Sequence, residues 1–360
     1  MATAAYCSIA ARDVHGGGCL LHGHADSDLL LATCKVHGNG SCSCPLVEMA
    51  MATMTAMAMG PIAMAYLQSV NGTNDAQIKA KPYWQYRTSR SRPKPTQIAE
   101  RHDIRSEEGD IVSHFALWHT EPGKFYGLRA EIAIWGSPNQ ESTQASGASI
   151  LVACDDGGLP VIIEAGFHVA PFLYNNNRDV RFFTFWTRDD WRTTGCYNLI
   201  CPGFVPANGA ALTPGQAVAP PSSYDGEDRY IRISLNKDPN SGDWVLYRHD
   251  LDNPSFLGHF PGDLCPQTPR VLAFQGYVNY PKNGQGPPMG SGHFPEEDDK
   301  KSAYFKHIKL IDSKGHAVDP ITTHMISVVD RPDCYNETGV LVIIHKGYMF
   351  YYGGPPGCIG

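Results

Sequence analysis

The chain has 360 residues, a formal net charge of −7 and 42% hydrophobic residues, enough for a sizeable core in one large all-β domain or two smaller ones. The mildly acidic balance gives no sign of a nucleic-acid partner, and no uninterrupted apolar run has the length of a membrane span. The 36 glycines and 27 prolines favour many turns and short strands over long helices.

Residues 1–80 lack hydrophobic periodicity, and we expect a disordered, low-complexity region there. They do not open with a standard signal peptide. The uncharged, Ala/Met-rich run 49–67 is signal-like if translation starts near Met49. Five cysteines and four histidines precede residue 45, but without the paired C-x₂₋₄-C spacing of a zinc knuckle. We therefore expect no metal and no other cofactor.

Residues 81–111 are polar, basic and proline-containing, which predicts a linker. From residue 112 onward, short β-rich runs alternate with turn clusters, and "KDPNSGDW" is typical of a hairpin loop. No stretch there has convincing helical spacing. The pattern predicts an all-β fold, an antiparallel, jelly-roll-like β-sandwich of about ten strands.

One carboxylate interrupts the apolar strand "VIIEAGFHV". By the two-residue period of strands, Glu164, Gly166 and His168 share one face, and the other face is apolar. A charge and an imidazole beside a glycine suit a binding cleft; the alternative is an ordinary solvent-facing glutamate. Nearby aromatic side chains, including Tyr174 and Trp186, suit a cleft wall for proline or sugar rings, or pack in the core.

Cysteines and sequons favour a secreted protein. A tight turn in "CYNLIC" brings Cys196 and Cys201 within disulfide reach. Asn71 ("NGT") and Asn336 ("NET") are N-glycosylation acceptors.

Several sequence blocks, taken in chain order, carry a resemblance to a known family: "YGLRAEIAIWGSPN", "IIEAGFHVAPFLY", "RFFTFWTRDDWRTTGCYNLICPGFV", "KDPNSGDWVL", "GHFPGDL", "MGSGHF" and "YYGGPPG". In this order they resemble the neprosin family of plant proteins, whose founding members are glutamic peptidases that cleave next to proline. The resemblance covers residues 112–360. It implies two packed seven-stranded antiparallel sheets with a cleft on one, secretion to the extracellular space or the vacuole, and the disulfides Cys196–Cys201 and Cys334–Cys358. Residues 81–111 then correspond to a remnant of the family's activation segment.

The family uses two glutamates on one water, one as base and one as acid. The first, in the motif E-A-G-W, corresponds to Glu164, with Phe167 in place of the tryptophan. The second, in W-G-G-E-V, corresponds to Tyr277 in "FQGYV". A tyrosine is a poor proton donor for this chemistry. Gln275 lies on the same strand face and resembles the glutamine of fungal glutamic peptidases; the alternative is a polar residue on a half-exposed strand.

These residues predict a catalytically impaired neprosin-like peptidase that acts on proline-containing peptides. The alternative function is a non-catalytic module that binds proline-rich or glycosylated cell-wall proteins. We expect His168, Tyr174 and Trp186 to bind the ligand. The expected partner is a proline-rich peptide or protein, with no nucleic acid and no membrane, and the protein is expected to be a monomer.

Overall fold

The computed structural model describes three strands before residue 44 and, further on, residues 111–122, 125–155, 160–189 and 194–360. The chain divides into two compact units, Met1–Lys81 and Pro82–Gly360. In the first unit, β1 (Gly18–Ala25), β2 (Asp28–Val36) and β3 (Cys42–Ser43) form an antiparallel sheet. The signal-like run 49–67, Asn71 and residues 81–110 lie outside the described residues.

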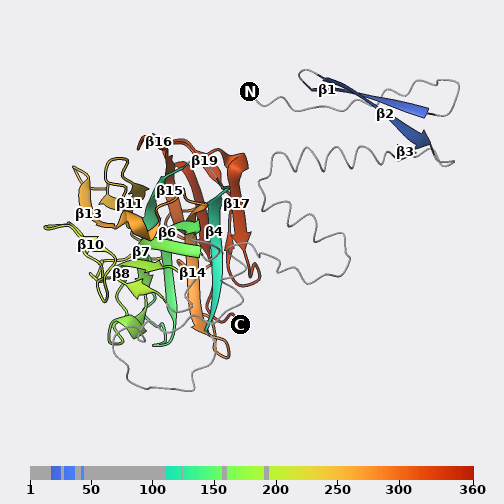
Figure 1. The fold of residues 1–360 in the computed structure, drawn as a ribbon. Helices are drawn as coiled ribbons and strands as arrows, with labels where there is room; N and C mark the ends of the chain where they lie inside the picture. Colours follow the sequence, from blue (N-terminus) through green and yellow to red (C-terminus); the bar gives the residue numbers. More distant parts are fainter. Residues whose placement is uncertain are drawn as a thin grey trace. The chain divides into compact units, whose positions relative to one another are not determined.

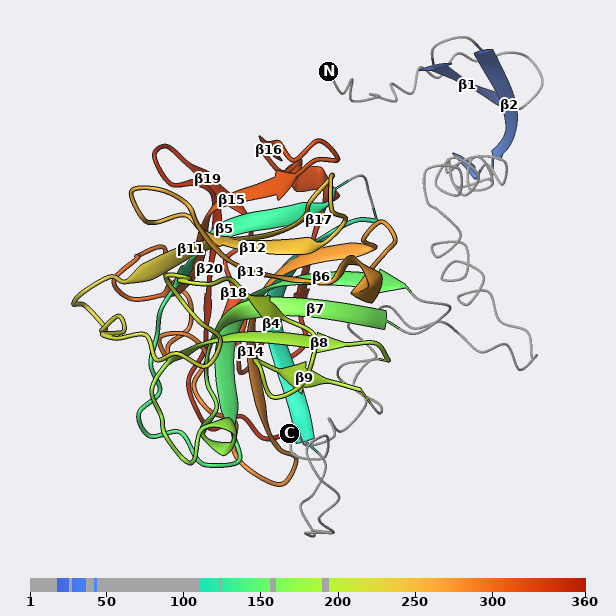
Figure 2. The ribbon, with the colours of Figure 1, turned by 60° about the vertical axis from the view of Figure 1, so that its left-hand side comes forward.

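The second unit contains a seven-stranded antiparallel sheet whose central strands lie side by side in Figure 2. Its strands, in spatial order, are β17 (Met325–Val329), β4 (Ile111–Thr120), β14 (Val271–Pro281), β6 (Ala145–Asp155), β7 (Pro160–Val169), β8 (Arg181–Thr187) and β9 (Cys196–Tyr197).

The second sheet of this unit has ten strands (Figure 1). Their spatial order is β10 (Val205–Pro206), β13 (Ser255–Phe260), β12 (Trp244–Arg248), β11 (Tyr230–Lys237), β5 (Gly127–Ala133), β15 (Ala303–Ile311), β20 (Gly347–Gly353) and β18 (Asn336–Glu337). Two short strands extend it, β16 (Ala317–Val318) beside β15 and β19 (Leu341–Ile343) beside β20.

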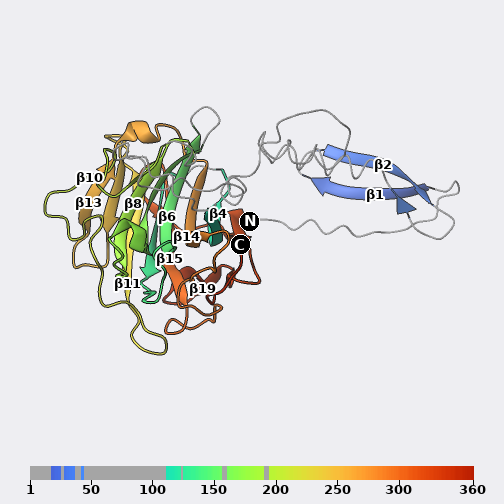
Figure 3. The ribbon, with the colours of Figure 1, turned by 90° about the horizontal axis from the view of Figure 1, so that it is seen from below.

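The two sheets pack face to face over one apolar core (Figure 3). Strand alternation explains the core: Leu128, Ala130 and Ile132 of β5 point inward, and Ile163 and Phe167 do so from β7. The predicted antiparallel β-sandwich is therefore confirmed. The part of the chain that is described has no α-helix, only the 3₁₀ turns η2 (Pro171–Leu173), η3 (Gly262–Leu264) and η4 (Thr322–His324), and none of its helical segments is long or apolar enough to span a bilayer.

Two details of the strand prediction differ. The resemblance implies seven strands in each sheet, but short edge strands raise one sheet to ten. The β-rich run 340–352 is not one continuous strand, because it folds into β19, a turn and β20. Within that turn, His345 (φ 71°) and Gly347 (φ 68°) adopt left-handed backbone conformations, which end an extended run.

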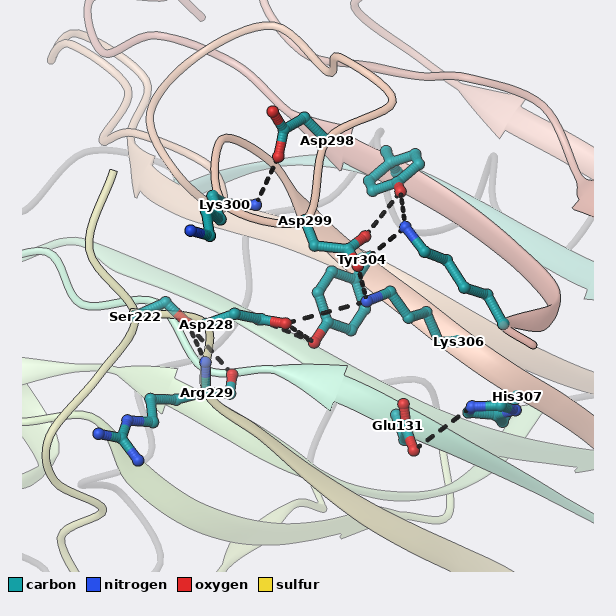
Figure 4. Close-up of polar contacts among 12 residues, drawn as sticks. Glu131, Ser222, Asp228, Arg229, Asp298, Asp299, Lys300, Tyr304, Lys306 and His307 are labelled. Carbon is teal, nitrogen blue, oxygen red and sulfur yellow. Dashed lines mark hydrogen bonds and ion pairs between the residues drawn. The ribbon is translucent and has the colours of Figure 1, made fainter. Parts of the chain in front are cut away.

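A buried ionic network joins the loop before β15 to the ten-stranded sheet (Figure 4). Lys306 of β15 pairs with Asp299, and its Nζ lies 3.6 Å from the centroid of the Tyr304 ring. The Tyr304 hydroxyl donates to Asp228 at 2.9 Å, and the Tyr351 hydroxyl donates to Asp299 at 2.7 Å. Because each buried charge has a partner of opposite sign, the network holds the loop without an uncompensated ion.

Three disulfides staple the second unit. The structure contains the two bonds that the resemblance implies, Cys196–Cys201 and Cys334–Cys358. A third, Cys154–Cys265, was not predicted; it links β6 of one sheet to the segment that follows η3 near the other, across 111 residues of chain. The pairing is not apparent in the sequence because residues so far apart meet only through the fold.

Removing the long-range disulfide should cost more stability than removing a local one. For Cys154→Ala with Cys265→Ala, the chain-entropy model predicts a loss of about 5 kcal/mol in unfolding free energy, against about 2 kcal/mol for Cys196→Ala with Cys201→Ala, whose cysteines are 5 residues apart. Urea unfolding of both double variants measures this difference. Equal losses of unfolding free energy in the two variants would show that the length of the closed loop does not determine how much each disulfide stabilises the protein.

Candidate functional site

Glu164 of β7 is buried on the outer face of the seven-stranded sheet, 3% exposed. Its Oε1 accepts hydrogen bonds from the Ser149 hydroxyl at 2.7 Å and from the Gln275 side-chain amide at 2.8 Å. Gln275 Nε2 also donates to Ser149 Oγ at 2.9 Å. The three side chains form a closed hydrogen-bonded triangle that satisfies the buried carboxylate.

Strand register explains why these groups meet. Gln275 of β14, Ser149 of β6 and Gly166 of β7 lie in one cross-strand row. Glu164 lies one step further along β7 on the same face, so its side chain reaches diagonally to Ser149 and Gln275. The alternatives of a solvent-facing Glu164 and a half-exposed Gln275 are wrong, since Gln275 is only 1% exposed. The structure brings Gln275 and Glu164 into direct hydrogen-bond contact.

A second hydrogen-bonded chain runs through the neighbouring row. Tyr277 of β14, Gly147 of β6 and His168 of β7 lie opposite one another. The Tyr277 hydroxyl lies 3.2 Å from His168 Nδ1, and the Tyr174 hydroxyl lies 2.9 Å from His168 Nε2. The imidazole stacks on the Phe183 ring, with centroids 4.1 Å apart and planes at 11°. His168 therefore bridges two tyrosines in a fixed orientation.

The contacts of Asn198 assign the direction of this chain. Asn198 Oδ1 accepts from the Thr184 backbone N–H, so Asn198 Nδ2 is the donor to the Tyr174 hydroxyl at 3.0 Å. The Tyr174 proton then goes to His168 Nε2, the acceptor within its reach among the described residues. His168 consequently carries its proton on Nδ1 and donates to Tyr277. The hydroxyl proton of Tyr277 is directed away from His168.

The electrostatics agree with a neutral relay. Burial, with a smaller contribution from the Arg181 guanidinium, lowers the pKa of His168 to about 3. Burial raises the pKa of Tyr174 to about 12. Both groups stay uncharged at mildly acidic and neutral pH, so they act as hydrogen-bonding groups and not as charges.

One predicted site residue is misplaced. Trp186 was expected on the ligand-binding face, but it packs against the core between the sheets, on the side of β8 that carries Phe182. Phe183 and Phe185 occupy the face that carries Glu164 and cluster there with Tyr197 and Tyr277. Both faces of β8 carry apolar side chains, so the alternation of residues along the strand does not show which face points into the core. Asn336 lies in β18 of the ten-stranded sheet.

Three functional positions were missed in the sequence. Ser149 shares a face with Gly147 by parity, but only the strand register places it against Glu164. Asn198 has a left-handed backbone (φ 53°) inside the "CYNLIC" turn, a signal that is not visible in the residue pattern. Gly147 is required because a Cβ there would lie 2.7 Å from the His168 Cβ and 3.0 Å from the Tyr277 ring.

A side chain at Gly147 should separate His168 from Tyr277. Gly147→Ala should lower the unfolding free energy by about 1–3 kcal/mol through overpacking, as measured by urea unfolding. Gly136→Ala is the matched control, because its nearest new contact would be 3.3 Å from a proline ring carbon. A Gly147→Ala protein as stable as wild type would contradict the tight packing.

His168 should make the protein less stable in acid. Its folded-state pKa of about 3 lies below the ordinary value of about 6.5. The unfolded state therefore binds more protons between these values, and stability falls as pH drops from about 6.5, by up to about 1.4 kcal/mol per pH unit. His168→Gln should flatten this slope in urea unfolding between about pH 4 and 7. His324→Gln, at an exposed residue, should leave the slope unchanged; a wild-type slope in His168→Gln would contradict the assignment.

The chain resembles one known family and several solved structures. The family model Neprosin matches residues 142–355. Solved structures that resemble the chain include scytalido-glutamic peptidase with a peptide-based transition-state analogue (TM-score 0.35), the same peptidase with a transition-state analogue inhibitor (0.34), and SCP-B of the eqolisin peptidases with the tripeptide Ala-Ile-His (0.33). Each has 10% sequence identity to this chain, and each alignment covers 67% of this chain and 98% of the other. The family model spans more than half of the chain, which therefore belongs to the Neprosin family.

Proposed function

We propose that this protein binds proline-containing peptides on the Glu164 face of its seven-stranded sheet and that its peptidase activity is severely impaired. The observation that carries the proposal is Tyr277. It takes the position that corresponds to the family's second glutamate, and it is held by His168 at 3.2 Å.

The chemistry of the face explains the impairment. Peptide hydrolysis by this route needs a carboxylate to take a proton from water and an acid to give one to the leaving nitrogen. Glu164, which accepts from Ser149 and Gln275, suits the first role. A phenol is a weaker acid than a carboxylic acid and is a poor substitute in the second role, although Tyr277 can donate a hydrogen bond to a peptide carbonyl.

The aromatic surroundings support peptide binding. Phe183, Phe185, Tyr197 and Tyr277 form one cluster on the Glu164 face, and such rings pack well against proline. The four rings are buried in the structure, so in this proposal a peptide that reaches them is held by contacts that do not require the second acid. The same features support the alternative of a purely non-catalytic module for proline-rich or glycosylated cell-wall proteins.

A second catalytic mechanism, with Glu164 and Gln275 as the catalytic pair, is supported by a separate contact. Gln275 Nε2 lies 2.8 Å from Glu164 Oε1, so a Glu164–Gln275 pair supplies a base and an amide donor for the oxyanion. In this case residual cleavage depends on both residues and not on Tyr277.

We also propose that the protein works outside the cytosol as a monomer. Three disulfides are typical of an oxidising compartment such as the extracellular space or the vacuole. Asn336 is the proposed glycosylation acceptor within the described residues, and Asn71 is the second.

Restoring the second carboxylate tests the proposal. The full chain with Tyr277→Glu should cleave a fluorogenic peptide with a central proline about 10²–10⁴-fold faster than wild type at mildly acidic pH, because it regains the missing acid. Tyr277→Phe is the matched control, since it changes the same position without adding an acid, and should gain nothing. Glu164→Gln added to Tyr277→Glu should remove the gain.

Cleavage and binding assays on the wild-type protein distinguish the impaired peptidase from the two alternatives. Fast cleavage by wild type that is lost in Glu164→Gln and in Gln275→Ala would replace impairment with the Glu164–Gln275 mechanism. Peptide binding without turnover, in wild type and in Tyr277→Glu alike, would leave the non-catalytic module. Absence of peptide binding by calorimetry would reject the proposed ligand class.

A further inference from the structure

The outer face of the ten-stranded sheet carries a continuous row of side chains across five strands. Lys309, Arg129, Ser234, Tyr247 and Phe256 are successive cross-strand neighbours on β15, β5, β11, β12 and β13. The strands' alternate residues, such as Leu128 and Leu246, lie in the core, so the row faces away from it. From Arg129 to Phe256 the row extends three strand spacings, about 14 Å.

Among the described residues, Arg129 differs from the neighbouring charged side chains of this face because it has no ion-pair partner. Arg232 pairs with Glu131, and Lys309 pairs with Asp319. Glu131 also faces His307 of β15, with 3.8 Å between His307 Nε2 and Glu131 Oε1 (Figure 4). Each carboxylate of these pairs is thus already engaged by a cation.

Within the described residues, Arg129 has neither a carboxylate partner nor a hydrogen-bond partner for its buried Nε. It is half-buried, and burial together with the neighbouring Arg232 lowers its pKa. A guanidinium that is partly desolvated and lies beside a second guanidinium favours the approach of an anion.

Aromatic rings continue the row at its other end. Tyr247 lies 5.2 Å from Phe256 and 6.1 Å from His249 between ring centroids, and the Phe256 ring is parallel to that of His259 within 7°. Phe256 is 38% exposed. His249 is held by Ser234 at 2.8 Å, which places a hydroxyl and an imidazole between the arginine and the rings. Aromatic rings at a surface suit the apolar faces of sugars, and the polar groups suit hydroxyls.

We propose that this row binds a short acidic oligosaccharide, with its carboxylate on Arg129 and its sugar rings on Tyr247 and Phe256. The guanidinium gives a bidentate site for the carboxylate. The aromatic row contacts the sugars beyond it. The site lies on the opposite sheet from Glu164 and does not depend on the peptidase proposal.

Calorimetry on the full chain tests the carboxylate requirement directly in the wild-type protein. The probe is a linear oligomer of galacturonic acid, compared with the same oligomer as its methyl ester. The acid should bind at least ~10-fold more tightly than the ester, because only the acid makes the charge-assisted contact with Arg129. Added salt should weaken the binding of the acid and leave the binding of the ester unchanged. Equal affinities, or no binding of either, would overturn the proposal.

Variants then test the location. Arg129→Gln and Tyr247→Ala should each weaken acid binding by ~10-fold or more, and Arg129→Gln should abolish the preference for the acid over the ester. Arg188→Gln, an exposed arginine that pairs with Asp263, is the matched control and should have no effect. Should Arg129→Gln fail to fold, Phe256→Ala at the exposed end of the row provides the same test. Unchanged binding in the variants that fold would refute the site.

Discussion

The packing of one sheet against the other is the constraint on which the rest of the molecule depends. Side chains alternate along each strand, so burying one set in the common core commits the other set to the outer face. Val161, Ile163 and Phe167 of β7 fill the core, and this fixes Glu164 and His168 on the outside. The same rule places Arg129 and Glu131 on the outside of β5. The positions of the Glu164 face and of the Arg129 row therefore both result from the packing of the two sheets.

The buried polar side chains at the Glu164 and His168 positions of the seven-stranded sheet are tolerated because each has hydrogen-bond partners. Glu164 is 3% exposed and is stabilised by the Ser149 hydroxyl and the Gln275 amide. His168 stays neutral and passes hydrogen bonds from Tyr174 to Tyr277. Without these partners, a carboxylate or an imidazole at such burial would be strongly unfavourable. The glycine at position 147 is part of the same arrangement, since it leaves the space in which two rings meet across β6.

On the ten-stranded sheet, charged side chains are compensated mainly by ion pairs. Its outer face carries many ions, and ion pairs such as Lys306 with Asp299 and Arg232 with Glu131 compensate most of them and hold the loop before β15. Arg129 stands apart from this pattern, beside a hydroxyl and a row of rings. A structural network explains paired charges well. A guanidinium that has no carboxylate partner among the described residues, in one row with aromatic side chains, is typical of a surface that receives an anion.

The sequence by itself determined the all-β class, the antiparallel sandwich and the face shared by Glu164 and His168, because a period of two is a local property of the chain. The family motifs also indicated the positions of Tyr277 and Gln275. Only the tertiary structure decided that Gln275 and Ser149 contact Glu164, that Trp186 turns into the core, and that Cys154 meets Cys265. Cross-strand register and the choice of inward face depend on residues distant in the chain. Local patterns of polarity carry no information about such contacts.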